Sequence, residues 1–547
     1  MHMTATTATS YREGAMTSEQ RMVIFASSLG TVFEWYDFYI YGTLGVFLAK
    51  YFFSNVPPNV GFIFALLAFA AGFAVRPFGA LIFGRIGDMI GRKYTFLITM
   101  SLMGVGTFFI GVLPGYASWG IMAPIVLIGL RLVQGLALGG EYGGAAIYVA
   151  EHAPKNKRGF YTSWIQTTAT VGLFMALLLI LGIRTAMGEQ AFGDWGWRIP
   201  FAASLILLVF SVYIRLKLQE SPVFQKMKSE GKGSTQPLTD SFFKYPNNKF
   251  VLLALLGATA GQGVVWYTGQ FYALFFLTIT LKLDYVSAYT LIGLSLLIGT
   301  PFFIVFGWLS DKVGRLKIIL LGCLIAAVTY FPLFAGLTHY VNPALEEFAA
   351  KTPITVAANG ADCKFHLFVG PWSQFSNCDR VKDFLTKQGL SFKSVPAVPG
   401  KDVVTTIGTT KVEGWDQKQL TDVLKQSGYP GGADKAKVNW VMTEIILVIM
   451  VIYVTMVYGP IAAFLVELFP TKIRYTSMSL PYHIGNGWFG GMLPLTATAL
   501  VAATGDIYFG LWYPIIVALM TLVIGGFFLT ETRHRDIRTY DHHQLTP

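Results

Sequence analysis

Charged residues are scarce in this chain. Asp, Glu, Lys and Arg make up 13% of its 547 residues, whereas ordinary soluble domains carry about 25%. A chain of this size with so little charge could not cover its apolar surface in water, which disfavours a soluble or disordered protein. The sequence contains three cysteines, too few for a disulfide-rich scaffold. These shortages favour a protein whose surface is covered by lipid.

Sequence patterns of enzymes are also missing. We find no nucleophile–base pattern, no His/Cys/Asp cluster with metal-ligand spacing and no Walker-type phosphate loop. We therefore expect no enzymatic activity, no bound metal or cofactor, and no drive by ATP hydrolysis.

Apolar residues are abundant: they make up 54% of the chain, and the mean hydropathy is +0.54. A membrane-spanning helix needs about 20 mostly apolar residues, and the sequence contains twelve such runs. Continuous runs of this length favour helices over barrel strands, so we predict an all-α polytopic membrane protein. The runs lie at 22–48, 61–83, 94–114, 120–149, 160–182, 198–215, 250–279, 286–309, 317–338, 439–466, 475–502 and 508–530.

The net charge of +11 would suit a nucleic-acid-binding protein, but the cations are distributed as in a membrane protein. If both chain ends lie in the cytoplasm, most lysines and arginines outside the predicted insertion fall in the ends and the cytoplasmic loops. This asymmetry predicts cytoplasmic N and C termini. We expect a small-molecule substrate and the lipid bilayer as partners, no nucleic acid, and a monomer.

Two short patterns occur twice along the chain, which predicts two related six-helix halves. An Asp followed four residues later by Arg comes after the second and the eighth run, and a Glu followed seven residues later by Arg comes after the fourth and the tenth. The corresponding residues are Asp88 with Asp311, Arg92 with Arg315, Glu151 with Glu467, and Arg158 with Arg474.

The second half is longer because it carries an insertion. Its two patterns lie 93 residues further apart than those of the first half, and a polar stretch at 339–437 accounts for the difference. We predict a small α/β-like domain outside the cytoplasm, with helices near 379–388 and 416–427 and strands near 391–395 and 402–412. Cys363 and Cys378 are predicted to form a disulfide there; the alternative is two free thiols.

These observations divide the chain into seven parts. They are an N-terminal tail (1–21), an N-terminal half (22–217), a linker (218–248), helices 7–9 (249–338), the insertion (339–437), helices 10–12 (438–531) and a C-terminal tail (532–547).

Several short motifs indicate a family. They are Glu34–Phe38, Arg76–Gly79, Gly84–Lys93, Arg131–Gly135, Gly139–Tyr142 and Asp194–Pro200. Together they resemble the major facilitator superfamily, and within it the metabolite:proton symporters, which include α-ketoglutarate permeases, shikimate permeases and proline/betaine transporters. The resemblance covers nearly all of the chain except the insertion. It implies secondary active transport by alternating access across a bacterial inner membrane.

Charges within the predicted spans are candidates for proton coupling, because a charge inside a membrane is expensive and usually functional. Glu34 and Asp37 share one face of helix 1, and each needs a cation partner or a proton. In related sugar–proton symporters an Asp of helix 1 faces an Arg of helix 4, so the resemblance nominates Asp37 or Glu34 with Arg131. The alternative is a permanent salt bridge. Glu141 is predicted to be a proton relay or a gate partner.

Arg76 is the first candidate for binding a substrate carboxylate, because a guanidinium grips carboxylates with two hydrogen bonds. The alternative is a cation that packs helices. Further polar and aromatic side chains could line a central site, and His483 could tune a pH response. These predicted substrate-binding residues are Tyr36, Tyr41, Gln166, Gln262, Trp266, Tyr267, Gln270, His483 and Asn486.

The repeated charges are predicted to form a cytoplasmic gate. In the family, residues at the positions of Asp88, Arg92, Asp311 and Arg315 latch the two halves together. Glu151 with Arg158 and Glu467 with Arg474 would add the matching pairs.

The sequence thus predicts a secondary transporter, with proton symport of a small organic acid or related metabolite as the first interpretation. A carrier of zwitterionic osmolytes such as proline or betaine, and a transporter-like ligand sensor, are the alternatives.

Overall fold

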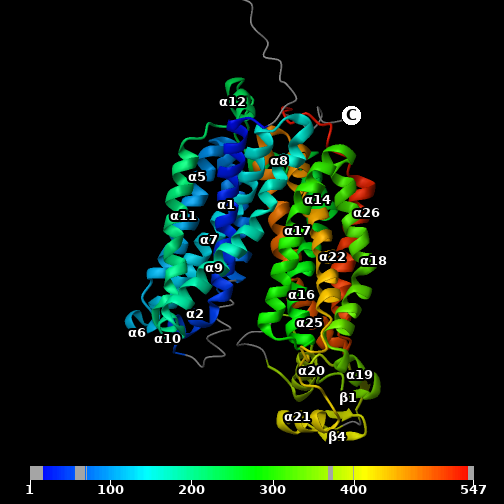
Figure 1. Cartoon of the computed structure of the whole chain (residues 1–547). Helices are drawn as coiled ribbons and strands as arrows, with labels where there is room; N and C mark the ends of the chain where they lie inside the picture. The colour runs from blue at the N-terminus through cyan, green and yellow to red at the C-terminus, as the bar shows by residue number, and fades with distance from the viewer. Residues whose placement is uncertain (1–15, 56–67, 69, 368–373, 398–399, 540–547) are drawn as a thin grey trace, which may run out of the picture.

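The computed structural model describes residues 16–55, 68, 70–367, 374–397 and 400–539. Two helical bundles stand side by side, the N-terminal one blue to green-cyan and the C-terminal one green to red (Figure 1). The predicted all-α membrane fold with two halves is confirmed. Helix α1 begins, and the last helix ends, at the end of the bundles opposite the insertion (Figure 1).

The N-terminal half starts at a capping box, in which Thr17 and Gln20 satisfy each other's backbone N–H groups. Its helices are α1 (Ser18–Thr43), α2 (Gly45–Phe52), α4 (Arg76–Met89), α5 (Arg92–Val112), α6 (Tyr116–Trp119), α7 (Met122–His152), η1 (Lys155–Lys157), α8 (Arg158–Gln166), α9 (Thr168–Met187), α10 (Glu189–Ala191), η2 (Phe192–Gly196) and α11 (Arg198–Leu216). Two short helices, α12 (Pro222–Ser229) and α13 (Pro237–Phe242), lie between the halves in sequence.

The C-terminal half contains helices that change their winding along their length. Its elements are α14 (Asn247–Ala254), η3 (Leu255–Thr259), α15 (Ala260–Tyr267), η4 (Thr268–Tyr272), α16 (Ala273–Phe275), η5 (Phe276–Thr280), α17 (Tyr285–Val313), α18 (Arg315–Val341), α22 (Trp440–Tyr458), α23 (Ile461–Leu468), η6 (Thr471–Ile473), α24 (Arg474–His483), η7 (Ile484–Gly490), α25 (Leu493–Thr504), η8 (Phe509–Leu511) and α26 (Trp512–Phe528).

Ten helical segments in the described part of the chain are long and apolar enough to cross a membrane. The other two of the twelve predicted spans are α1 and the run at 61–83. Helix α1 carries Glu34 and Asp37, and it runs alongside the other long helices of its bundle (Figure 1). Much of the 61–83 run lies outside the described residues, and its last part begins α4.

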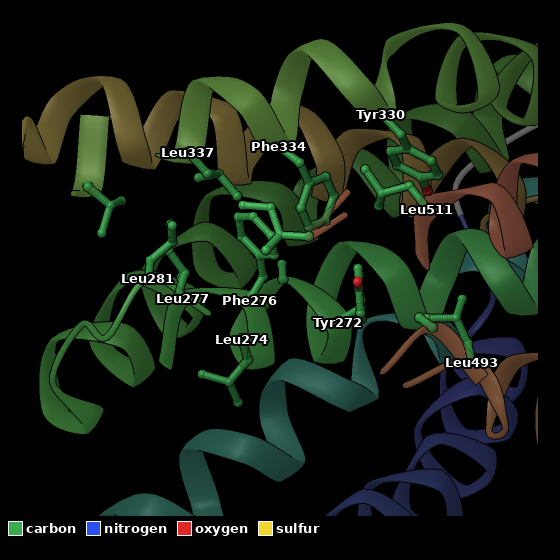
Figure 2. Packing of buried hydrophobic residues seen from close by; sticks show 14 of the residues in the cluster. Tyr272, Leu274, Phe276, Leu277, Leu281, Tyr330, Phe334, Leu337, Leu493 and Leu511 are labelled. Carbon is green, nitrogen blue, oxygen red and sulfur yellow. The ribbon is translucent and has the colours of Figure 1, made fainter. Parts of the chain in front are cut away.

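The core of the C-terminal half is a continuous apolar cluster that extends into the insertion. Figure 2 shows Phe276 and Phe334 packed between helices, with Leu337 beside them and Tyr330 further along. The Phe276 and Phe334 rings meet edge to face at 5.0 Å. Leu345, Phe348 and Val356 of the insertion belong to the same cluster, so burial of apolar surface holds the insertion against the helices.

The insertion is an α/β domain. Its elements are α19 (Pro343–Lys351), β1 (Ile354–Ala358), α20 (Asn377–Lys387), β2 (Lys393–Pro396), β3 (Val404–Ile407), β4 (Thr410–Glu413) and α21 (Gln417–Gln426). The strands form one sheet in the order β2-β1-β3-β4, in which β1 is parallel to β2 and antiparallel to β3. Strand β1 and helix α19 were not anticipated from the sequence. Cys363 and Cys378 are joined in a disulfide.

Backbone hydrogen bonds dock the insertion on the ends of the C-terminal helices. The Phe392 N–H donates to the carbonyl of Gly505 at 2.7 Å, and the Ala433 N–H donates to the carbonyl of Lys282 at 3.1 Å. Gly505 ends α25 in the left-handed region, with φ at 78°, and a Cβ there would lie 2.2 Å from the Phe392 carbonyl oxygen. A glycine is needed here both for its conformation and for this close approach.

The stability of the insertion is expected to fall in acid because of Asp379. Burial raises the pKa of the Asp379 carboxyl, but hydrogen bonds from His366 and from the backbone of Ser376 and Lys364 outweigh it and hold the pKa below its ordinary value. This stabilisation is therefore present above the unfolded pKa of about 3.9 and is lost as pH falls through the lower folded pKa.

Hydrogen exchange of the insertion amides between pH 7 and pH 3 measures the effect. Asp379→Asn should raise exchange at pH 7 and weaken its pH dependence, whereas Asp383→Asn, a more exposed carboxylate on the same helix, should leave both unchanged. Equal pH dependence in wild type and Asp379→Asn would contradict the assignment.

Candidate functional site

Three buried ion pairs cross the N-terminal half. They join Asp37 with Arg131, Glu34 with Arg76, and Glu141 with Arg215. Each pair links residues at least 42 positions apart in the chain, so the packing of the helices brings them together. Since a buried charge is costly without a partner, the pairs mark positions where the fold must compensate or exchange charge.

Asp37 is the most completely coordinated of the three carboxylates. Its Oδ2 accepts from Arg131 Nη1 at 2.8 Å, and its Oδ1 accepts from Thr107 Oγ1 at 2.9 Å and Gln134 Nε2 at 3.1 Å. The side chains of Asp37 and Arg131 are 1% and 3% exposed. The guanidinium carbon of Arg131 lies 4.1 Å from the ring centre of Tyr41. Of the two carboxylates nominated for Arg131, the structure pairs Asp37 with it.

Glu34 instead pairs with Arg76, at 3.2 Å, and both side chains keep slightly more exposure, 11% and 13%. The Arg76 guanidinium also lies 4.1 Å from the ring centre of Phe73. Its buried Nε has no hydrogen-bond partner among the described residues. This arginine is therefore bound by a single carboxylate contact and keeps a donor for a further acceptor.

Glu141 is held by Arg215, which the distribution of cations assigns to the cytoplasmic loop after the sixth predicted span. That assignment is wrong: Arg215 belongs to α11, is 1% exposed, and donates from Nη2 to Glu141 Oε1 at 2.8 Å and from Nη1 to the Phe96 carbonyl at 2.8 Å. Gly30 makes room for this pair, because a Cβ there would lie 1.9 Å from both charged groups. Arg215 thus joins Arg76 and Arg131 as an arginine that pairs with a carboxylate between the helices of this half.

Five of the predicted substrate-binding residues carry a buried polar atom with no hydrogen-bond partner in the described part of the chain. Such atoms are uncommon in folded proteins, and a substrate or water can satisfy them. They come from both halves and are Arg76 Nε, Gln166 Oε1, Trp266 Nε1, Gln270 Nε2 and His483 Nε2.

The remaining predicted substrate-binding residues are engaged within the protein or packed. Gln262 and Asn486 exchange two amide hydrogen bonds of 2.9 Å, and the Tyr36 hydroxyl donates to the Pro200 carbonyl. Tyr267 packs edge to face on Trp266 at 5.0 Å. These contacts favour structural roles for Tyr36, Gln262 and Asn486 in this conformation.

Aromatic rings connect the two halves beside these polar atoms. Trp35 of α1 stacks on Trp266 of α15 at 4.9 Å, and Tyr142 of α7 stacks on Tyr482 of α24 at 3.9 Å with 8° between the planes. The Tyr458 hydroxyl hydrogen-bonds that of Tyr482 at 2.8 Å. Neither Tyr458 nor Tyr482 is among the residues predicted from the sequence. An aromatic residue within an apolar run gives no indication that its side chain faces the other half.

Two of the C-terminal spans contain π-helical turns next to predicted site residues. Gln270 lies within η4, and Asn486 lies within η7. A π turn locally widens the helix and shifts the side chains that follow, and such turns are frequent at functional sites.

The predicted gate residues lie at the end of the bundles opposite the insertion, and they join the halves. Asp88 accepts from the backbone N–H groups of Tyr475 at 3.1 Å and Thr476 at 2.8 Å. Asp311 accepts in the same way from Gly159 at 2.9 Å and Phe160 at 2.8 Å. Arg92 and Arg315 pair with these carboxylates four residues before them, at 2.8 Å and 2.6 Å.

The other four gate charges pair differently from the prediction. Arg474 binds Glu151 at 2.7 Å, and Arg158 binds Glu467 at 3.4 Å, so each pair crosses from one half to the other. The predicted pairing within each half is therefore wrong. The physical reason is that each arginine begins a helix, α8 or α24, that packs against the opposite half.

The gate also involves the chain after α26. The Thr532 hydroxyl donates to Glu467 at 2.9 Å, and Arg474 donates to the Ile537 carbonyl at 2.5 Å. The Glu531 carboxylate accepts from the first N–H groups of α18. In this conformation the two halves are tied together at this end.

The arrangement provides buried carboxylate–arginine pairs, unpartnered polar atoms between the halves and a closed gate at one end. No group of three or more His, Cys, Asp and Glu residues that could hold a metal is found among the described residues. Two pseudo-symmetric membrane bundles with these features have the architecture of the major facilitator fold.

Comparisons with known proteins agree. The sequence matches the family described as "Sugar (and other) transporter" over residues 22–241 and 425–543, and the chain belongs to this family. It is 38% identical to the proline/betaine transporter of Escherichia coli (strain K12) over 57% of this chain; the match spans 64% of that protein. It is 30% identical to the inner membrane metabolite transport protein YhjE of the same organism, over 98% of this chain and 100% of the relative.

The fold is likewise similar to that of a solved structure, the proton:xylose symporter XylE bound to 6-bromo-6-deoxy-D-glucose. The TM-score is 0.64 at 15% identity, covering 95% of this chain and 98% of that one.

Proposed function

We propose that this transporter is a proton symporter for a small organic acid or related metabolite, with Asp37 as the proton site. The supporting observation is the buried Asp37–Arg131 pair, in which Asp37 accepts three hydrogen bonds, from Arg131, Thr107 and Gln134. Protonation of Asp37 removes the charge that Arg131 neutralises, so the pair breaks and its helices are free to move. Proton binding is thereby coupled to the change of conformation.

The substrate carboxylate is proposed to bind Arg76. Its Nε is a buried donor, and its contact with Glu34 is longer than the Asp37–Arg131 contact. A carboxylate can replace or join Glu34 with two parallel hydrogen bonds. Gln166, Trp266 and Gln270 would then contact the rest of the substrate from both halves.

Transport would proceed by rocking the halves about this site. The crossed gate pairs close the end that we assign to the cytoplasm from the distribution of cations, so this conformation is open, or ready to open, toward the insertion. We assign the protein to a bacterial inner membrane, with both termini in the cytoplasm, and expect it to act as a monomer.

The second candidate is a carrier of zwitterionic osmolytes. The aromatic rings beside Glu34 favour it, because a quaternary or secondary ammonium group is attracted to ring faces and Trp35, Trp266 and Tyr458 lie together. The proline/betaine relative supports it as well.

Uptake by proteoliposomes tests the proposal. We expect organic acids such as a C4–C5 dicarboxylate or shikimate to accumulate when the outside is acid, and a protonophore to abolish the accumulation. Accumulation of betaine or proline alone, enhanced by osmotic upshift, would favour the second candidate. Uptake that follows a sodium gradient instead would overturn proton coupling, and absence of any flux would favour a ligand sensor.

A further inference from the structure

The insertion has a disulfide and a cavity at one edge of its sheet. Strands β1 and β2 are parallel and joined through α20, whereas β3 lies on the other side of β1. The chain leaves the carboxyl end of β1 toward α20 at an edge of the sheet where the antiparallel strand β3 begins. Helix α20 begins after this edge, and neither the edge nor the start of α20 is part of the transport site.

The disulfide occupies this edge. Cys378 is the second residue of α20, directly after the capping residue Ser376 and Asn377, and is 2% exposed. Its partner Cys363 follows β1 and is half-buried. A thiolate at Cys378 would be stabilised by the helix N-terminus, so Cys378 is the better leaving group of the two sulfurs. Cys363 is the sulfur that an incoming thiol can reach.

A cavity of about 220 Å³ opens beside the bond. Cys363, His366 and Asp379 line it from the insertion, and Thr498 and Ala502 of α25 line its opposite side. A structural disulfide needs no cavity at its accessible sulfur. This one leaves room for a second molecule to approach Cys363.

The cavity also contains a proton acceptor. His366 Nε2 lies 2.9 Å from Asp379 Oδ2, a contact that orients the imidazole. The other charged residues that line the cavity are Lys364, Lys382 and Asp383, and the wall from α25 contributes none. We therefore assign His366 as the proton acceptor of the cavity.

We propose that the Cys363–Cys378 pair is a thiol–disulfide exchange site for a dithiol from the side of the membrane that the insertion faces. An incoming thiol gives its proton to His366, and the thiolate attacks Cys363 Sγ. The Cys363–Cys378 bond breaks, and its electron pair leaves with Cys378 as a thiolate at the start of α20. The second thiol of the substrate then displaces Cys363 Sγ. The dithiol loses two electrons and two protons in total and becomes a disulfide. Cys363 and Cys378 gain these electrons and protons and become two thiols.

The first test measures exchange in the full-length protein in lipid nanodiscs, in a Cys323→Ala background that removes the buried third cysteine. The protein is incubated with dithiothreitol at several pH values, quenched with acid and labelled with a maleimide. We expect complete reduction without denaturant and a rate at pH 7 at least ten-fold lower in His366→Gln, with a flatter pH profile over the range in which histidine titrates.

His339→Gln is the matched control, because His339 also pairs with a carboxylate, Glu346 at 3.0 Å, but does not line the cavity. It should react like the wild type. Reduction of the wild type only after a denaturant is added would overturn the proposal. Equal reduction rates in His366→Gln and His339→Gln would overturn the role of His366 as proton acceptor.

The second test distinguishes the two sulfurs. In Cys378→Ser the remaining Cys363 should form a mixed disulfide with an aromatic disulfide reagent about ten-fold faster than the remaining Cys378 does in Cys363→Ser. This follows from their exposure, since thiol reactivity requires access. Faster reaction of Cys378 would reverse the assigned roles and overturn the proposed order of attack.

Discussion

Asp37→Asn is expected to reduce proton-driven accumulation by about a hundred-fold or more. Asparagine cannot take up a proton at this position, and it leaves Arg131 buried without a counter-charge, which costs about 3–5 kcal/mol for a buried pair. A change of 1.36 kcal/mol corresponds to about ten-fold in rate. The amide can still accept from Thr107 and Gln134, which contact Asp37 Oδ1, so the local packing should persist.

The measurement compares uptake driven by a pH gradient with exchange of labelled for unlabelled substrate at equal pH. Exchange needs no net proton movement, so it should fall much less than accumulation in Asp37→Asn. Glu189→Gln is the control, because Glu189 pairs with Arg184 at the surface and is 73% exposed. Accumulation that survives both Asp37→Asn and Glu34→Gln would rule out a helix 1 carboxylate as the proton site.

Gly159→Leu is expected to force open the gate end of the transporter. A Cβ on Gly159 would lie 2.4 Å from the Gly307 carbonyl oxygen, 2.5 Å from Ser310 Oγ and 2.8 Å from Arg315 Nη1. These atoms belong to the opposite half, so the added side chain must separate α8 from α17. Overpacking of this kind costs about 1–3 kcal/mol, which shifts the equilibrium between closed and open gates roughly ten- to hundred-fold.

Spin labels on Met89 and Val313, two exposed residues at the ends of α4 and α17, report the separation of the halves. The distance distribution should move to longer values in Gly159→Leu, and net uptake should fall because the closed state is no longer well populated. Gly182→Leu on α9 is the matched control, since no atom lies within 4 Å of a Cβ at Gly182. An unchanged distance distribution in Gly159→Leu would show that this contact does not close the gate.

Features that depend on local composition could be predicted from the sequence. The apolar runs predict the spans because lipid requires about 20 apolar residues per helix, and the repeated Asp–Arg and Glu–Arg patterns predict two halves. Asp37 and Arg131 were nominated together, although by resemblance to a family rather than by periodicity. Strand β1 escaped prediction although Ile354, Thr355 and Val356 favour a strand, because a run of only five residues is short beside a longer polar segment.

Features that depend on distant residues could not be predicted. Glu141 and Arg215 are 74 positions apart. Because Arg215 lies at the end of an apolar run, hydropathy assigns it to the loop that follows. The gate pairs were assigned within each half because sequence proximity suggested it, whereas Arg474 and Glu151 meet across 323 positions.

The sequence by itself determined the membrane class, the two halves, the insertion and a short set of charged residues in the spans. Hydropathy, charge asymmetry and repeats are properties of neighbouring residues, so folding does not change them. Only the tertiary structure decided which carboxylate faces which arginine, which polar atoms remain without a partner, and where the disulfide lies relative to a cavity. A buried charge is satisfied by the side chain that packing brings to it, and packing joins residues from anywhere in the chain.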